Sequence, residues 1–266
     1  MTLIIHQLSP NNEADLALIP AIARIHLAAW LTNGLYRTIY YGPPSSYPAI
    51  NEYNEKRHLQ SLKKDPTARL AVVWDDTVRE KDRDSAGAGA RTSTDGDRQP
   101  SPDQIIAWTK YNIFTTAEGA EERTDTGERL EWPAYTNLAL VTGFWEALVK
   151  SREQNNQDIG AHVSVDQLAT DPAHHRRGAG RMLMQHVAAQ ADALNLPVTL
   201  EASPQGMNVY RSVGFEPHHE FWVDLARFED GGDKGEEWTE QRGRREGQGE
   251  GWYKEVAMVR AAPTTK

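Results

Sequence analysis

Residues 163–215 of this sequence read VSVDQLATDPAHHRRGAGRMLMQHVAAQADALNLPVTLEASPQGMNVYRSVGF. The β-branched opening predicts a strand, and the segment HHRRGAG after it predicts a tight turn. Apolar residues then recur at helical spacing, at Leu183, Val187, Ala191 and Leu194. The stretch therefore predicts a strand that passes through a glycine-rich turn directly into an amphipathic helix.

The turn has the chemistry of an anion-binding site. The first amides of a helix have no partner within the helix, and the helix N-terminus carries a partial positive charge. Gly178 and Gly180 let a ligand approach the backbone, and three arginines flank them, namely Arg176, Arg177 and Arg181. We expect a phosphorylated ligand at this turn.

Two familiar phosphate motifs do not fit the turn. A Walker loop ends in Gly-Lys-Ser/Thr, whereas Gly180 is followed by Arg181 and Met182. A Rossmann turn needs a third glycine and a downstream acidic residue within a βαβ unit, and neither is present here. The ligand is therefore expected to differ from those that these two motifs bind.

Composition limits the class of protein. A chain of 266 residues with 39% hydrophobic content can bury a core, and we predict one domain over residues 1–266. The net charge of -9 and the pI near 5.5 argue against a nucleic-acid partner, because such binding depends on neutralising phosphates. The acidic balance favours either a cationic amine partner or simple solubility.

Cysteine is absent, so disulfides, thiolate nucleophiles and cysteine-based zinc sites are excluded. The first twelve residues, MTLIIHQLSPNN, do not have the pattern of a secretory signal. No apolar run approaches the roughly 20 residues of a bilayer span. We expect no membrane partner and a cytosolic or nuclear location.

Further elements are predicted on both sides of this stretch. Alternating or β-branched runs predict strands, and apolar residues at helical spacing predict helices. The predicted strands cover residues 3–8, 69–75, 104–114, 220–228 and 252–260, and the predicted helices cover 15–30, 35–41, 50–64 and 135–150. Pro20 indicates a kink or a late start in the first helix, and the 50–64 helix is expected to be mostly exposed.

Two segments are rich in Gly and charged residues and poor in large apolar residues. They cover residues 78–103 and 229–251. Such segments cannot bury enough apolar surface to offset the entropy of ordering. We predict that both are disordered insertions, the first between two strands that pair as neighbours.

The 163–215 stretch resembles the GCN5-related N-acetyltransferase (GNAT) family. The family's Q/R-x-x-G-x-G/A turn is matched by residues 175–180, with His175 in place of the usual Gln or Arg. The strand before the turn, the strand PVTLEAS after the helix and the closing Tyr-x-x-x-Gly-Phe over 210–215 follow in family order. The N-terminal half resembles the family only in its pattern of elements.

The resemblance implies an α/β fold with a mixed, mostly antiparallel central sheet flanked by helices. It also implies acetyl-CoA as the cosubstrate, with its pyrophosphate at the turn and its pantetheine beside the preceding strand. The residues implicated are Leu168, Ala169, Thr170, His175, Arg176, Arg177, Gly178, Ala179, Gly180 and Arg181. A backbone N–H near Leu168 would stabilise the oxyanion formed during acyl transfer.

Tyr210 matches the family position whose phenol protonates the departing thiolate, and the alternative is a Tyr that only packs the helix on the sheet. The amine must lose a proton before it attacks, and the candidate bases are Glu201 and Asp166. His218 and His219 are further candidates, with the alternative of surface loop residues, and a water relay would make all of them dispensable. Each carboxylate has the alternative of a solvated or salt-bridged strand residue.

Several aromatic residues fall where the acceptor pocket is expected, and most should belong to the core: Trp30, Tyr36, Tyr40, Tyr41, Trp108 and Trp145. One or two could contact a cationic amine. His26 is expected to be a packed helix residue. The spacing of His, Asp and Glu suggests no metal site, so none is predicted.

The sequence thus predicts transfer of an acetyl group from acetyl-CoA to a primary amine, on a small molecule or a peptide, by direct attack in a ternary complex. Two alternatives remain: a non-catalytic sensor or scaffold that binds acetyl-CoA, and a peptide N-acetyltransferase that docks a partner through its insertions. The identity of the acceptor and the oligomeric state are not predicted.

Overall fold

The computed structural model describes residues 2–77, 99–121 and 130–263. Within these residues one sheet has seven strands in the order β1-β2-β3-β4-β5-β7-β6. Neighbours are antiparallel except β4 and β5, which are parallel. The strands are β1 (Leu3–Gln7), β2 (Ala68–Asp75), β3 (Ile105–Phe114), β4 (His162–Thr170), β5 (Val198–Ala202), β6 (Glu216–Asp224) and β7 (Trp252–Arg260).

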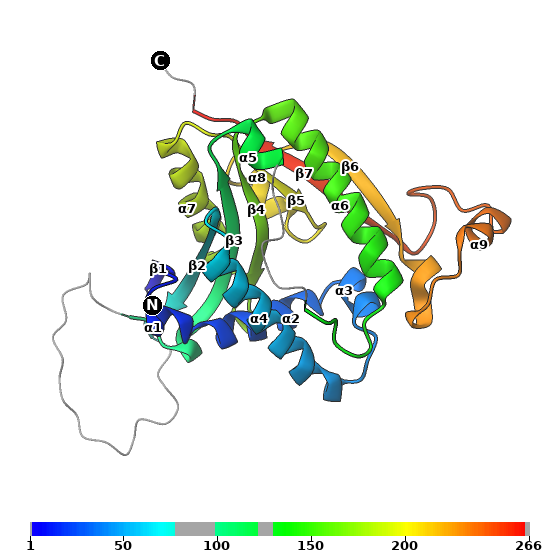
Figure 1. Ribbon diagram of the computed structural model, residues 1–266, viewed down its shortest axis with the longest axis horizontal. Coiled ribbons are helices and arrows are strands. Elements are labelled where there is room, and N and C mark those ends of the chain that lie inside the picture. The colour runs from blue at the N-terminus through cyan, green and yellow to red at the C-terminus, as the bar shows by residue number, and fades with distance from the viewer. Residues whose placement is uncertain (1, 78–98, 122–129, 264–266) are drawn as a thin grey trace.

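Helices cover both faces of this sheet (Figure 1). The α-helices are α1 (Glu13–Leu16), α2 (Ile19–Trp30), α3 (Gly34–Ile39), α4 (Tyr47–Lys64), α5 (Ala117–Glu121), α6 (Leu138–Ile159), α7 (Ala179–Ala193), α8 (Met207–Arg211) and α9 (Glu236–Gln241). Short 3-10 turns are η1 (Pro44–Ser46), η2 (Pro102–Gln104), η3 (Pro172–His174) and η4 (Leu225–Gly231).

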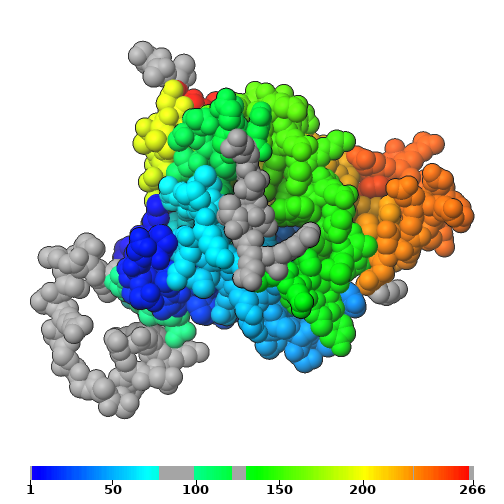
Figure 2. Space-filling model, in the orientation of Figure 1, coloured from blue at the N-terminus to red at the C-terminus, as the bar shows by residue number. Residues whose placement is uncertain are grey.

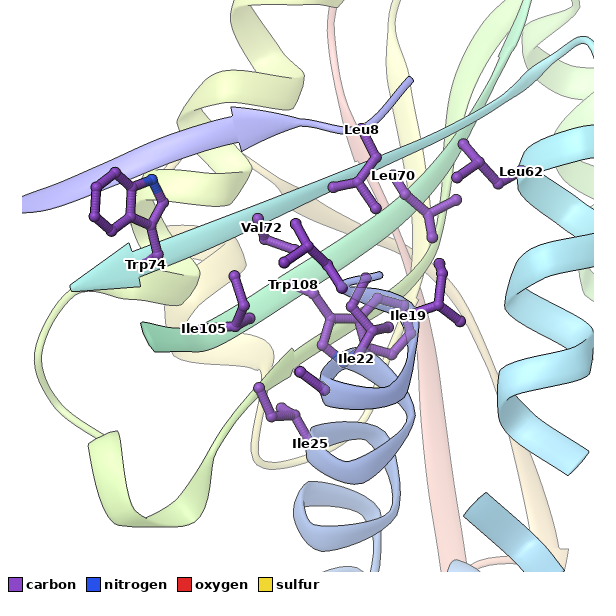
Figure 3. Close-up of a cluster of buried hydrophobic side chains, with 13 residues drawn as sticks. Leu8, Ile19, Ile22, Ile25, Leu62, Leu70, Val72, Trp74, Ile105 and Trp108 are labelled. Carbon is purple, nitrogen blue, oxygen red and sulfur yellow. The ribbon is translucent and has the colours of Figure 1, made fainter. Parts of the chain in front are cut away.

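Alternation along the strands divides the core between the two faces. Leu70 and Val72 of β2 pack with α2, whose Ile22 points toward the strands (Figure 3). Ala71 and Val73, the intervening residues, pack with α7 on the opposite face. The sheet is therefore enclosed by α2, α3, α4 and α6 on one face and by α7 and α8 on the other.

The predicted fold class is confirmed. β2 and β3 pair as antiparallel neighbours, as expected. Pro20 lies in the first turn of α2, so it marks a late helix start and no kink. β6 ends at Asp224, four residues before the predicted strand end, because the Asp224 carboxylate accepts the Ala226 N–H at 3.2 Å and begins η4.

Two helices differ from their predicted extent or exposure. α6 begins after Asn137, whose side chain accepts the Leu140 N–H at 3.1 Å, and continues nine residues past the predicted end. The 50–64 helix, α4, is not mostly exposed. It buries residues at helical spacing against α2 and the α6 side of the sheet, namely Ile50, Tyr53, Asn54, His58 and Leu62.

In the segment 229–251, which was predicted to be disordered, the structure shows α9 and a set of ion pairs, and the prediction of disorder stays a prediction. Arg227 binds both carboxylate oxygens of Asp233 at 2.6 and 2.9 Å. Arg244 binds Asp224 at the end of β6, and its guanidinium lies 5.7 Å from the Trp238 ring centroid. Composition alone missed these contacts because the charges are paired across turns. Figure 2 shows the segment, in orange, projecting beyond α6.

The other predicted insertion falls mostly outside the described residues. Of the segment 78–103, the structure describes only 99–103, where Gln99 donates to the Asp15 carboxylate at 2.7 Å. The prediction of disorder between β2 and β3 therefore stays a prediction.

Candidate active site

β4 and β5 part in the middle of the sheet. The β3–β4 register shifts at Asp166, which has no opposite residue on β3 and forms a β-bulge that bends β4. β4 pairs with β5 only over residues 163–165, although it stays paired with β3 as far as Thr170. Within the described residues, the β5-facing edge of β4 after Asp166 thus has no strand beside it.

The turn after β4 requires unusual backbone conformations. Asp171 accepts the Ala173 N–H at 2.9 Å and starts η3, and Arg176 then adopts a φ of 62°. Gly178, the N-cap of α7, has a φ of 86°, which favours glycine because other residues are strained there. The chain consequently turns sharply at Arg176 and Gly178, and α7 begins directly after this turn.

The predicted residues of β4 and of the turn lie together. A Cβ placed on Gly180 would lie 3.5 Å from Thr170 Oγ1 and 3.9 Å from Leu168 Cδ2, so the first turn of α7 touches the end of β4. Ala179 is buried beneath this contact. The open edge of β4 and the N-terminus of α7 therefore border one continuous site.

Two side chains of the turn hold it in place. Arg177 forms an ion pair with Asp75 at the end of β2, and its Nη1 lies 2.7 Å from His174 Nδ1. The His175 ring lies 3.1 Å from the Thr170 carbonyl oxygen. Arg177 is half-buried, whereas His175, Arg176 and Arg181 are exposed.

The ion pair of Asp75 has an electrostatic signature. Burial by itself would raise the pKa of this carboxyl, but hydrogen bonds from Arg177 and Thr77 outweigh burial and lower the pKa to about 2. Asp75 therefore stays ionised at neutral pH and keeps Arg177 against the sheet.

Tyr210, on α8, is buried beside the parting strands. Its ring packs 6.0 Å from that of Phe215, and a Cβ on Gly206 would lie only 2.7 Å from its Cε2 atom. Burial first, and then the charges of Glu255 and Glu201, raise the Tyr210 pKa above its ordinary value. The phenol is therefore held in its protonated form.

The two predicted candidate bases share one arginine. Arg152 on α6 lies 3.4 Å from an Asp166 carboxylate oxygen and 3.3 Å from Glu201 Oε2. Lys110 lies 3.1 Å from the other Asp166 oxygen, and Asn155 donates to Glu201 Oε1 at 3.3 Å. Both carboxylates are thus engaged with cations or amides, which is the salt-bridged alternative to a proton-accepting role.

Glu255 on β7 was not among the sequence candidates. It is 6% exposed, and its Oε1 accepts the Tyr253 hydroxyl at 2.7 Å. Burial is the main cause that raises its pKa to about 8, with a further contribution from Glu201 and an opposing one from the Tyr253 hydrogen bond. The sequence did offer a signal for Glu255, because it is an acidic residue among the apolar residues of β7, a strand that was predicted with its correct bounds.

These groups approach the gap from opposite faces. Leu200 and Val256 pack in the same cluster as Tyr210, on the α7 side. Strand side chains alternate, so Glu201 and Glu255 project from the α6 side. Both carboxylates raise the pKa of Tyr210, so the two sets of residues lie close enough to interact electrostatically.

Aromatic residues line the α6 side unevenly. The rings of Trp30 and Tyr36 stack at 4.0 Å, whereas Trp108 and Tyr40 are core residues and Tyr41 and Trp145 are exposed. His26 is a packed helix residue, as expected, and its Nδ1 lies 2.9 Å from His58 Nε2.

The part of the chain that the structure describes contains neither a metal-binding cluster nor a membrane-spanning helix. No group of three or more His, Asp or Glu side chains there is arranged to hold a metal ion. Among the same residues, no helix has the length and apolar character needed to cross a bilayer. Both statements concern described residues alone.

Residues 97–223 match the family model of the acetyltransferase (GNAT) domain. That range contains the whole 163–215 stretch, β3 and α6. A search of curated protein sequences gave no match.

Solved structures similar to this chain include several acetyltransferases. One is a histone acetyltransferase HPA2 and related acetyltransferase from Corynebacterium glutamicum, with a TM-score of 0.50, 14% identity and 100% of both chains covered. PaiA N-acetyltransferase from Thermoplasma acidophilum, in complex with coenzyme A, has a TM-score of 0.44, 9% identity and coverage of 98% and 99%. Arabidopsis thaliana NAA60 in complex with a bisubstrate analogue has a TM-score of 0.45 and 10% identity, with 99% of this chain and 100% of that chain covered. At such identities the likeness concerns the fold.

Proposed function

Residues 97–223 of this chain match the GNAT acetyltransferase domain, and from that premise we propose that the chain transfers the acetyl group of acetyl-CoA to a primary amine by direct attack in a ternary complex. The observation that carries the proposal is the gap between β4 and β5. A phosphate-type turn borders one side of this gap, and buried carboxylates border the other.

The donor side supports acetyl-CoA binding. The α7 N-terminus and the exposed Arg176 and Arg181 would bind the pyrophosphate, while Arg177 and His175 hold the turn. The open edge of β4 at Leu168–Thr170 supplies backbone groups for pantetheine and for the thioester carbonyl.

The chemical step needs one proton acceptor and one proton donor. The amine attacks the acetyl carbon, the C–N bond forms, and the C–S bond then breaks to release the coenzyme A thiolate. Tyr210 is the proposed donor to that thiolate, because its phenol is protonated and buried on α8 beside the parted strands. The chain contains no cysteine that could carry the acetyl group, which favours direct attack.

The test is a thiol-release assay with a matched pair of variants. Polyamines, aminoglycosides, amino acids and peptides are screened as acceptors, and Gly178→Glu is compared with Gly249→Glu. Gly178 and Gly249 have φ values of 86° and 87° and no neighbour within 4 Å of an added Cβ, so the backbone strain is alike. Only Gly178→Glu places a carboxylate at the phosphate turn.

We expect a large increase in the acetyl-CoA KM for Gly178→Glu alone. Equal acetyl-CoA affinities in the two variants would overturn the donor site. Acetyl-CoA binding by the wild type without thiol release for any acceptor would instead indicate a non-catalytic sensor.

A further inference from the structure

The residues around the gap contain one more carboxylate than cations. Asp166, Glu201 and Glu255 are the carboxylates, and Lys110 and Arg152 are the cations that pair with the first two. Glu255 forms no ion pair with any of the described residues. When Glu255 is ionised, the cluster carries one uncompensated negative charge, which a single ammonium group would balance.

The hydrogen bonds of Glu255 leave one oxygen available. Asn33 Nδ2 donates to the Tyr253 hydroxyl at 2.8 Å, so the hydroxyl proton is directed to Glu255 Oε1 at 2.7 Å. Glu255 Oε2 is buried and has no hydrogen-bond partner among the described residues. A buried carboxylate oxygen without a donor is costly, and a ligand N–H would satisfy it.

Groups from four elements surround Glu255. Tyr253 lies on its own strand, Glu201 projects from β5 and Tyr210 from α8, and Tyr36 approaches from α3. Arg57 on α4 and Arg152 on α6 both act on Tyr36, and among the described residues neither forms an ion pair with Glu255. Glu255 therefore faces carboxylate and phenol groups, the surroundings of a proton acceptor.

We propose that Glu255 accepts the proton that the acceptor ammonium loses before it attacks acetyl-CoA. The inference rests on the proposed function and assigns to Glu255 the role for which Glu201 and Asp166 were sequence candidates. It also makes the acceptor a primary amine that arrives as an ammonium ion.

The proton transfers of the proposed reaction balance. The ammonium gives one proton to Glu255, and the neutral amine forms the C–N bond with the acetyl carbon. The adduct then loses its second nitrogen proton as the C–S bond breaks, and Tyr210 protonates the thiolate and regains that second proton. Glu255 releases its proton to solvent, so each turnover yields acetylated amine, coenzyme A thiol and one proton.

The pKa of about 8 for Glu255 supports this role. An ordinary Glu has a pKa of about 4.3 and an ordinary primary ammonium about 10, so proton transfer between them is strongly unfavourable. The shift that burial produces reduces this difference while still leaving a usable ionised fraction near neutral pH.

Glu255→Gln tests the assignment, since it keeps the shape and removes the ability to accept the proton. We expect kcat to fall about 100-fold or more, with the acetyl-CoA KM unchanged. Glu220→Gln is the matched control, because Glu220 lies on the adjacent β6 with its side chain 47% exposed and pairs with Lys254. A thermal shift on adding coenzyme A verifies that each variant is folded.

The pH profile of kcat/KM gives a second readout. In the wild type, kcat/KM should rise with pH around pH 8. The midpoint of this rising limb should be the same for two acceptors whose ammonium pKa values differ. Tyr253→Phe removes the hydrogen bond that lowers the Glu255 pKa, so the limb should move to higher pH.

Three outcomes are distinguishable. An active Glu255→Gln enzyme that retains the limb overturns the assignment and leaves the acetyltransferase function intact. A Tyr253→Phe limb that stays in place overturns it as well. A wild type that releases no thiol with any amine overturns the proposed function, and the assignment with it.

Discussion

Arg152 Nε lies 3.3 Å from Glu201 Oε2, and this contact joins α6 to the strand that ends beside the gap. The sequence places the two residues 49 positions apart. Their pairing connects α6 with β5, which lies inside the 163–215 stretch that carries the family motif.

Arg152→Ala should destabilise the fold strongly. The change leaves Glu201 and Asp166, whose side chains are 5% and 8% exposed, without this cation, and such losses cost about 3 kcal/mol or more. Lys56→Ala is the control, because its pair with Glu52 is 57% and 66% exposed and should contribute little to stability. Urea unfolding measures both, and similar losses would contradict the argument.

Tyr210→Phe should lower kcat by about 100-fold and leave the acetyl-CoA KM nearly unchanged, because it removes only the proton donor. Gly206→Ala should act in the same direction, since its Cβ would lie 2.7 Å from the Tyr210 ring and displace it. Steady-state thiol release separates kcat from KM. An unchanged kcat in Tyr210→Phe would assign the tyrosine a packing role.

Asp75→Asn should loosen the phosphate turn and raise the acetyl-CoA KM, because Arg177 loses its partner. The pKa of Asp75 is lowered to about 2, below its unfolded value near 3.9, so its stabilisation is present above about pH 4 and is lost as pH falls toward 2. Unfolding from pH 5 to pH 2 should therefore lose stability more steeply in the wild type than in the variant. Parallel curves would count against this pair.

The pair His26 and His58 should make the protein sensitive to mild acid. Burial, the main cause, lowers the pKa of both rings, so the unfolded chain binds more protons below about pH 6.5. The contribution of the two neutral rings to the free energy of unfolding is therefore fully present above that pH. It falls as the pH decreases, by up to about 1.4 kcal/mol per pH unit for each ring. His58→Gln should flatten unfolding curves measured from pH 7.5 to pH 5, and an unchanged slope would exclude the pair.

Local pattern was sufficient for most elements. The strands β2, β3 and β7 are close to their predicted bounds, because alternation and β-branched residues report directly on burial in a sheet. The ion pairs of Arg227 and Arg244 at the segment 229–251 were not predicted, because a composition argument treats these residues as solvated.

The residues of the candidate site also differ in whether the sequence could predict them. The turn over 175–180 could be located from sequence, because left-handed glycine, flanking arginines and a following amphipathic helix are all local features. Glu255 could not, because its altered proton affinity arises from burial beneath α3 and α6 and from a carboxylate on β5, which lies over fifty residues earlier.

The sequence by itself located most strands and helices and the Gly- and Arg-rich turn over 175–180, since each follows from neighbouring residues, and the resemblance to the family implied the mostly antiparallel sheet. Only the tertiary structure decided where β4 bends away from β5, that Arg177 is an anchor of the turn, and that Asp166 and Glu201 share Arg152. Such properties depend on which charges are buried together, and distant segments acquire that proximity only when the sheet forms.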